Sequence, residues 1–151
     1  MTMLTLLLAC AEPTLTIGHG LAGDFIPYSE GEVVTLATAP QGGFGVPVRA
    51  QTTGLHCGTD DQPNAPIQVW LDTYIDGEVS ASFLNETAVI YCQDDGTGLV
   101  WDLVVGFDQE AYSTVDELIS LHGQEVELWV EAIDIDEISV GAWLTVEISA
   151  E

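Results

Sequence analysis

Basic side chains are almost absent from this 151-residue chain, which has no lysine and a single arginine, Arg49, against 25 Asp and Glu residues. Proteins bind phosphate backbones by neutralising their charge with Lys and Arg, so this composition excludes nucleic acid as a partner. The net charge of -24 also destabilises the compact state by self-repulsion, which dissolved salt screens. Stability must therefore come from burial, β-sheet hydrogen bonds and covalent cross-links rather than from ion pairs.

Long apolar runs are also missing, because the N-terminal run over residues 4–9 is far shorter than the roughly 20 residues that span a bilayer. Residues 7–10 read LLAC, which resembles the lipobox that precedes cleavage and lipidation of a Cys in bacterial lipoproteins. We therefore expect residues 1–9 to be a lipoprotein signal peptide, although basic residues and the usual length of 15 to 30 residues are lacking. Lipidated Cys10 would anchor the protein to the membrane, and Ala11 after it favours the outer membrane. The alternative is a first strand that ends in a core thiol.

Cysteine is scarce, and lipidation of Cys10 leaves the even pair Cys57 and Cys92. An oxidising envelope favours a disulfide between them. In the chain-entropy model, closing this loop of about 36 residues stabilises the fold by about 4 kcal/mol. Two buried free thiols are the alternative, whereas a zinc site is not favoured because neither Cys has a CxxC partner.

The pattern of short apolar runs predicts a single all-β domain. Hydrophobic residues make up 47% of the chain, which supports a packed core. The runs alternate with turn residues every 8 to 12 positions, as is typical of a β-sandwich or barrel. We expect a lipidated tether with a first strand over residues 10–23, and an acidic sandwich domain of about eight strands over residues 24–151. The expected strands cover residues 33–37, 46–53, 67–75, 79–83, 88–92, 99–107, 126–133 and 138–148.

One short connecting helix is predicted between the expected strands over residues 99–107 and 126–133. Thr114 and Glu117 form a capping-box pattern at its start, and Gly123 supplies a stop at its end. Helices of this size commonly bridge the two sheets of a sandwich, so we expect a connection rather than a layer.

Residues 17–55 combine G-x-G, F-x-P followed by a hydrophobic residue, a Glu-Gly turn, a hydrophobic strand, P-Q-G-G and a strand with one basic residue. The residues concerned are Gly18, Gly20, Phe25, Pro27, Glu30, Gly31, Pro40, Gln41, Gly42, Gly43 and Arg49. Over this quarter of the chain the sequence resembles the N-terminal half of a group of predicted bacterial lipoproteins of unknown function. The resemblance implies an immunoglobulin-like β-sandwich and no assigned activity. These proteins often carry a His after the double glycine, where this chain has Phe44 and Gly45, so no metal role is carried over.

Acidic residues cluster at several turns, and the best candidate calcium site is formed by Asp134, Asp136 and Glu137 at a strand end. Calcium prefers several oxygen ligands gathered on a loop. The complete EF-hand spacing is absent, and with 25 acids in the chain solvated turn residues are the alternative. No other cofactor is expected, and His19, His56 and His122 are interpreted as unrelated surface or capping residues.

The clearest alternation lies near the C-terminus and predicts an antiparallel hairpin that turns at residues 135–137. Its register places Trp129 opposite Trp143 on the outer face, because a slip of one residue would expose every apolar side chain. We hypothesise that these two residues, with Trp70 and Tyr74, form a contact patch, and core packing is the alternative. The interior pairs of the same register are Leu128 with Leu144 and Val130 with Ala142.

Catalytic motifs are missing as well, since the chain has neither a G-x-S-x-G elbow nor an H-E-x-x-H pattern. We expect a non-enzymatic, envelope-anchored lipoprotein that acts as a binding or surface-interaction module for a protein or carbohydrate ligand. A calcium-dependent adhesion module is the alternative, and a hydrolase is less favoured. Arg49 is expected to pair with a carboxylate, although it also suits an anionic ligand.

Overall fold

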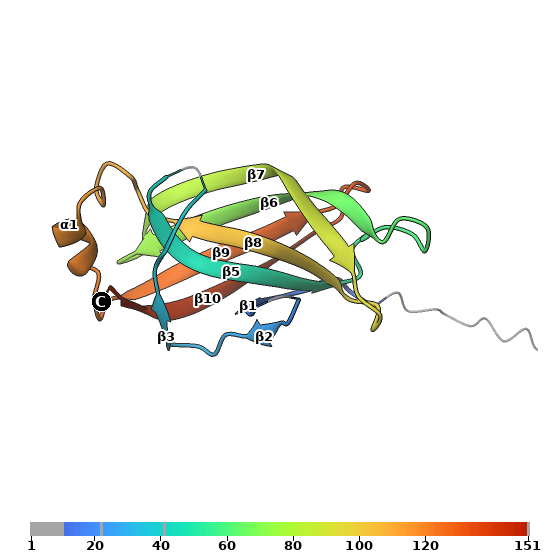
Figure 1. Cartoon of the computed structure of the whole chain (residues 1–151), viewed down its shortest axis with the longest axis horizontal. Helices are drawn as coiled ribbons and strands as arrows, with labels where there is room; N and C mark the ends of the chain where they lie inside the picture. The colour runs from blue at the N-terminus through green and yellow to red at the C-terminus, as the bar shows by residue number, and fades with distance from the viewer. Residues whose placement is uncertain (1–10, 22, 41, 151) are drawn as a thin grey trace, which may run out of the picture.

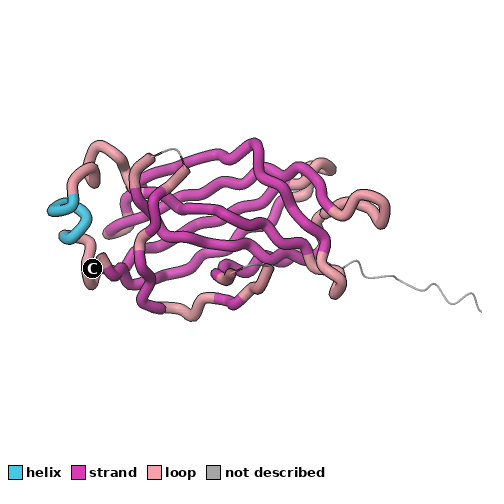
Figure 2. The backbone as a smooth tube through the Cα atoms, in the orientation of Figure 1, coloured by secondary structure: helices cyan, strands magenta, loops and turns pink. Residues whose placement is uncertain are grey.

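The computed structural model describes residues 11–21, 23–40 and 42–150, which form ten strands and one short helix (Figure 1). Strands make up most of the described residues, as Figure 2 shows. The expected all-β class is therefore confirmed, with ten strands instead of about eight. The elements are β1 (Thr14–His19), β2 (Ile26–Pro27), β3 (Glu32–Thr35), β4 (Ala37–Thr38), β5 (Phe44–Thr53), β6 (Asn64–Ile75), β7 (Glu78–Cys92), β8 (Gly98–Gly106), α1 (Val115–Ile119), β9 (Glu125–Ile133) and β10 (Ser139–Ser149).

All ten strands belong to one hydrogen-bonded sheet in the order β2-β1-β5-β8-β7-β6-β9-β10-β3, with β4 paired to β5. The pairing is antiparallel except between β10 and β3, which run parallel. The sheet curls until β1 lies beside β10. The segment between β2 and β3 is hydrogen-bonded to β10, because the amide of Gly31 donates to the carbonyl of Thr145 (2.8 Å). The layers of the sandwich thus come from one continuous sheet.

The core fills the inside of the curl. Burial alternates along β6 and β9, so each strand turns one set of side chains inward and the other outward. The one buried polar residue of these two strands, Thr73 near the end of β6, has its hydrogen-bonding need met because its hydroxyl donates to the carbonyl of Gly106. The inward residues of these two strands are Ala65, Ile67, Val69, Leu71, Val126, Leu128, Val130 and Ala132.

Strand β7 differs from the expectation, because residues 79–83 and 88–92 belong to one long strand. The polar stretch between them is typical of a turn, and the side chain of Asn85 accepts from the amide of Thr87 (3.0 Å). The sheet absorbs this local bend as a bulge, since β7 advances three residues from Asn85 to Ala88 while β6 advances two. Pairing with β6 therefore continues through a sequence that resembles a loop.

The C-terminal hairpin has the predicted register. Trp129 lies opposite Trp143, and the interior pairs of Leu128 with Leu144 and Val130 with Ala142 are also as expected. The turn between β9 and β10 falls at residues 134–138, and Glu137 has a positive φ of 62°. Because one face of both strands is buried, the hydrophobic pattern alone fixes their alignment.

Helix α1 lies at one end of the molecule, beyond the strand ends (Figure 1). Thr114 is its N-cap, and the capping box with Glu117 is complete. Hydrogen bonds from the amides and hydroxyls of Thr114 and Ser113 hold the pKa of the Glu117 carboxyl below its ordinary value of 4.5. The helix connects β8 to β9, as expected. Among the described residues, no helix has the length and apolar character needed to cross a membrane.

Candidate functional site

Three aromatic side chains line up on the outer face of the sheet where β6, β9 and β10 lie side by side. The ring centroids of Trp129 and Trp143 are 5.0 Å apart, and those of Trp143 and Tyr74 are 5.1 Å apart. We call Tyr74, Trp129 and Trp143 the aromatic row. Trp143 at its centre is 58% exposed, a large apolar surface for a residue in the middle of a strand.

A glycine makes room for the first ring of the row. A Cβ atom on Gly141 would lie 2.3 Å from Cη2 and Cζ2 of the Trp129 indole, so the ring rests directly on the backbone of β10. Any larger residue at this position would displace the indole. Sequence reasoning identified the two tryptophans but missed the role of Gly141. A glycine inside a strand often marks a place where another group approaches the backbone closely, and Gly141 lies on the same outward face as Trp143.

Trp70 extends the exposed aromatic surface along β6. It lies opposite Glu131 of β9 and is 37% exposed. The next outward residue of β6, Asp72, lies opposite Trp129, and its carboxylate accepts a hydrogen bond from the hydroxyl of Ser82 (2.6 Å). All four aromatic residues of the hypothesised patch are thus on this part of the sheet, within the row or beside it.

Carboxylates surround the aromatic row. Glu127 lies opposite Tyr74 on the neighbouring strand, and Glu125 lies directly opposite Glu147 in the β9–β10 ladder. Like charges that oppose each other across a ladder destabilise the sheet. A shallow hollow of about 900 Å³ next to the row is lined by Tyr74 and by these acids together with Asp76. The outer face therefore combines exposed aromatic rings with uncompensated negative charge.

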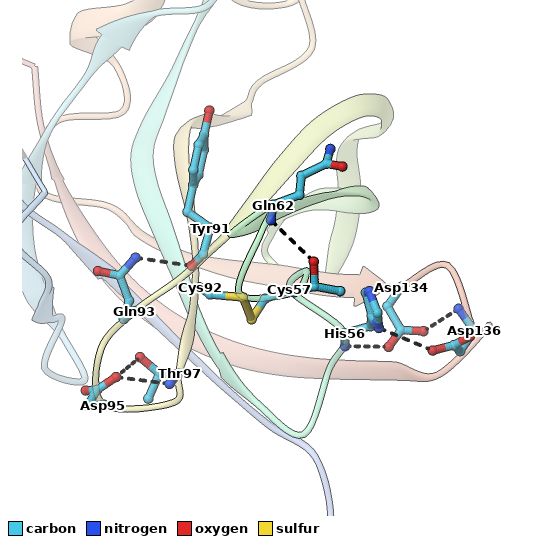
Figure 3. Close-up of a disulfide and its surroundings, with 11 residues drawn as sticks. His56, Cys57, Gln62, Tyr91, Cys92, Gln93, Asp95, Thr97, Asp134 and Asp136 are labelled. Carbon is cyan, nitrogen blue, oxygen red and sulfur yellow. Dashed lines mark hydrogen bonds and ion pairs between the residues drawn. A yellow bond between two sulfur atoms is a disulfide. The ribbon is translucent and has the colours of Figure 1, made fainter.

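The predicted calcium ligands lie at the β9–β10 turn, where Asp134 accepts hydrogen bonds from the backbone. Its carboxylate is buried, with 5% of the residue exposed, and accepts three backbone amides, of which Figure 3 shows those of His56 and Asp136. Oδ1 accepts from Asp136 and Ile138 (both 2.9 Å), and Oδ2 accepts from His56 (2.8 Å). Asp134 therefore closes the hairpin turn and ties it to the loop that follows β5.

The other two predicted ligands are exposed. A carboxylate oxygen of Asp136 lies 3.7 Å from Nδ1 of His56, and Glu137 sits beyond it in the turn. Within residues 11–21, 23–40 and 42–150, no group of three or more His, Cys, Asp or Glu side chains is arranged to hold a metal ion. The calcium site stays a prediction that this geometry does not favour.

The expected disulfide is confirmed in the same region (Figure 3). Cys57 and Cys92 are bonded, with their Cα atoms 5.1 Å apart and a sequence separation of 35. The bond joins the loop after β5 to the end of β7. Two adjacent residues therefore anchor this loop: His56 through its hydrogen bond to Asp134, and Cys57 through the disulfide.

The sequence suggested that Arg49 pairs with a carboxylate, but the described residues contain no such pair. Its guanidinium donates to the backbone carbonyl of Asp24 (2.7 Å) and lies over the indole of Trp101, 5.8 Å from the ring centroid. Tyr91 stacks on the same indole at 4.7 Å. The single basic side chain of the chain is therefore held on β5, on a strand that is not adjacent to the aromatic row.

The histidines lie apart, as expected. His19 stacks on Tyr28 with 4.6 Å between ring centroids, and its Nε2 is 3.8 Å from a Glu32 carboxylate oxygen. Burial, and then the negative charge of Glu32, raises the pKa of Tyr28 to about 12. His122 follows the helix and accepts the amide of Ala150 through Nδ1 (3.3 Å).

A second hollow opens between β7 and β8. These strands pair only from Ile90 to Cys92, and beyond this point a cleft of about 350 Å³ leads toward the core. Asp102 has a positive φ of 55° where β8 leaves β7. Phe83 lines the opening, and the far end is closed by a hydrogen bond from the amide of Asp108 to Ser80 (3.3 Å). Polar and apolar groups line the cleft in nearly equal measure, and the sequence did not indicate it.

Comparison with known proteins adds no relative to this picture. No family model matches the chain, and none of the curated proteins is similar in sequence. The predicted lipidation at Cys10 falls within residues 1–10, which lie outside the described residues.

Proposed function

We propose that this protein is an envelope-anchored lipoprotein whose domain binds a ligand, without catalysis, through the aromatic row on its outer face. The observation that carries the proposal is the exposed indole of Trp143, which packs between the half-buried rings of Trp129 and Tyr74 on the outer face of the sheet. Exposed indoles cost solvation free energy, and contiguous exposed apolar surface marks interaction sites in soluble domains. The row is presented by three adjacent strands, which gives a rigid platform.

The membrane anchor is supported by the LLAC sequence at residues 7–10 and by the disulfide, which is typical of proteins outside the cytoplasm. A Cys10→Ser variant is expected to leave the membrane fraction and to lose the lipid-dependent mass increase. Membrane association that is unchanged in this variant would reject the anchor.

The binding role is tested with the unlipidated full-length chain and isolated envelopes of the producing cells. The Trp129→Ala/Trp143→Ala variant is expected to lose saturable sedimentation with envelopes, because two of the three rings of the aromatic row are removed. Phe83→Ala is the matched control, since it also removes an exposed aromatic side chain but lies in the β7–β8 cleft. Equal binding of native chain and double variant, with native circular dichroism, would reject the aromatic row as the contact face.

A calcium-dependent adhesion module is the second reading of the acidic surface. It has less support, because both carboxylate oxygens of the best candidate ligand, Asp134, already accept hydrogen bonds from backbone amides. Calorimetric titration of the native chain with calcium is the direct test, and a saturable heat that disappears in Asp134→Asn would favour this alternative.

A further inference from the structure

The aromatic row has a chemical character that narrows its ligand, provided that it is the contact face proposed above. Its three rings are inclined to one another, by 41° between Trp129 and Trp143 and by 56° between Trp143 and Tyr74. A sugar chain that stacks on several rings at once needs rings that share one plane, which these inclined rings do not provide. An ammonium or guanidinium group needs only one ring face within about 6 Å.

Charge points the same way. The strands that carry the row also carry Glu125, Glu127 and Glu147, and two of these acids oppose each other directly. The one basic side chain, Arg49, lies on β5 and is occupied by Asp24 and Trp101. Nothing in the described chain therefore offsets the negative charge beside the row.

We propose that the aromatic row binds a Lys- or Arg-rich segment of a partner protein, with its cationic groups on the indole faces and its neighbouring charges against the flanking glutamates. The exposed ring of Trp143 and the accessible part of Trp129 supply cation–π contacts, and the hollow beside Tyr74 supplies the counter-charges. Binding would relieve the like-charge repulsion between Glu125 and Glu147. The remainder of the net charge of -24 attracts such a partner from a distance and raises its association rate.

The test titrates the purified full-length chain with hexalysine as the probe, or with cellohexaose as a neutral sugar, and measures binding by calorimetry at physiological salt. Native protein is expected to bind hexalysine and not cellohexaose. Trp143→Ala should weaken hexalysine binding by severalfold, and Trp129→Ala/Trp143→Ala by roughly tenfold, because each ring contributes a cation–π contact. The single variant changes a residue outside the core, which keeps the test valid if the double variant is poorly folded.

A charge-matched pair of variants separates a local site from the general field of an acidic protein. Glu127→Gln/Glu147→Gln and Asp60→Asn/Asp61→Asn each remove two charges, but the second pair lies in the exposed loop between β5 and β6. The glutamate variant should weaken binding and reduce its salt dependence, whereas the loop variant should bind as the native chain does. Equal weakening in both variants would overturn the proposal, because the field alone would then explain the binding.

Competition distinguishes failure of the ligand class from failure of the contact face. Hexalysine is expected to displace the native chain from envelopes. Envelope binding that depends on Trp129 and Trp143 but resists hexalysine, or cellohexaose binding that depends on the same rings, would reject a cationic ligand and retain the face. Hexalysine binding that is unchanged in the tryptophan variants would reject the site for cations, and envelope binding that is also unchanged would reject the face itself.

Discussion

Replacing Asp134 tests the structural role that the β9–β10 turn assigns to it. Its carboxylate accepts three backbone amides and is almost completely buried. Asp134→Ala removes all three bonds and leaves the donors of His56, Asp136 and Ile138 to whatever water can reach them. A hydrogen bond to a charged group contributes about 1.5–3 kcal/mol, so partial rehydration still leaves a loss of roughly 3 to 5 kcal/mol.

Asp134→Asn separates the acceptor from the charge. An amide oxygen in the position of Oδ1 keeps the bonds from Asp136 and Ile138, but its NH2 group then faces the donor of His56. The expected loss is about 1 to 3 kcal/mol. Asp136→Asn is the matched control, because this exposed carboxylate reaches only the His56 ring, at 3.7 Å, and a surface pair contributes at most about 1 kcal/mol.

Urea unfolding followed by tryptophan fluorescence measures these differences, with the expected order native, Asp136→Asn, Asp134→Asn and Asp134→Ala from most to least stable. For a domain of this size, Asp134→Ala should lower Tm by about 10 °C. An Asp134→Ala variant as stable as the Asp136→Asn control would refute the turn-closing role. Calcium that stabilises native protein but not Asp134→Asn, beyond the effect of NaCl at equal ionic strength, would instead restore the metal site.

Three further predictions concern the rest of the fold. Cys57→Ser/Cys92→Ser removes the cross-link over 35 positions and should cost about 4 kcal/mol in urea unfolding; a loss below about 1 kcal/mol would contradict the constraint. The pKa of Tyr28 is raised to about 12, so its contribution is complete below pH 10 and is lost as pH rises from 10 to 12; the Tyr28→Phe variant should lack this part of the alkaline loss, and identical pH profiles would count against it. The pKa of Glu117 is lowered from 4.5 by its capping bonds, so its contribution is complete above that pH and is lost as pH falls through the folded-state pKa; Glu117→Gln should flatten the acid limb of the stability profile, and an unchanged limb would reject the linkage.

The sequence predicted elements in which burial is one-sided and the chain is regular. The C-terminal hairpin is the best example, because alternating apolar residues on both strands allow a single register. The disulfide followed from an even cysteine pair, and the helix start from the spacing of Thr114 and Glu117. In each case the determining interaction is local or is limited to one possible partner.

The features that the sequence missed depend on distant contacts. The two-residue strands β2 and β4 are too short to show a period, and they exist because β1 and β5 offer them an edge. The bulge of β7 places turn-forming residues inside a strand, since pairing with β6 on both sides of it outweighs the local preference. Likewise, Asp134 resembled a metal ligand because nothing in the sequence indicates that the amide of His56, 78 positions away, would reach its carboxylate.

The most direct test of the aromatic row as a binding face is the titration of ¹⁵N-labelled full-length protein with hexalysine, followed through the indole N–H signals of its four tryptophans. Trp129 and Trp143 should shift together and yield one dissociation constant. The indole N–H signal of Trp101 should not shift, because its Nε1 is buried and its ring packs against Arg49. Signals of Trp129 and Trp143 that do not move, or that move no more than that of Trp101, would contradict the account.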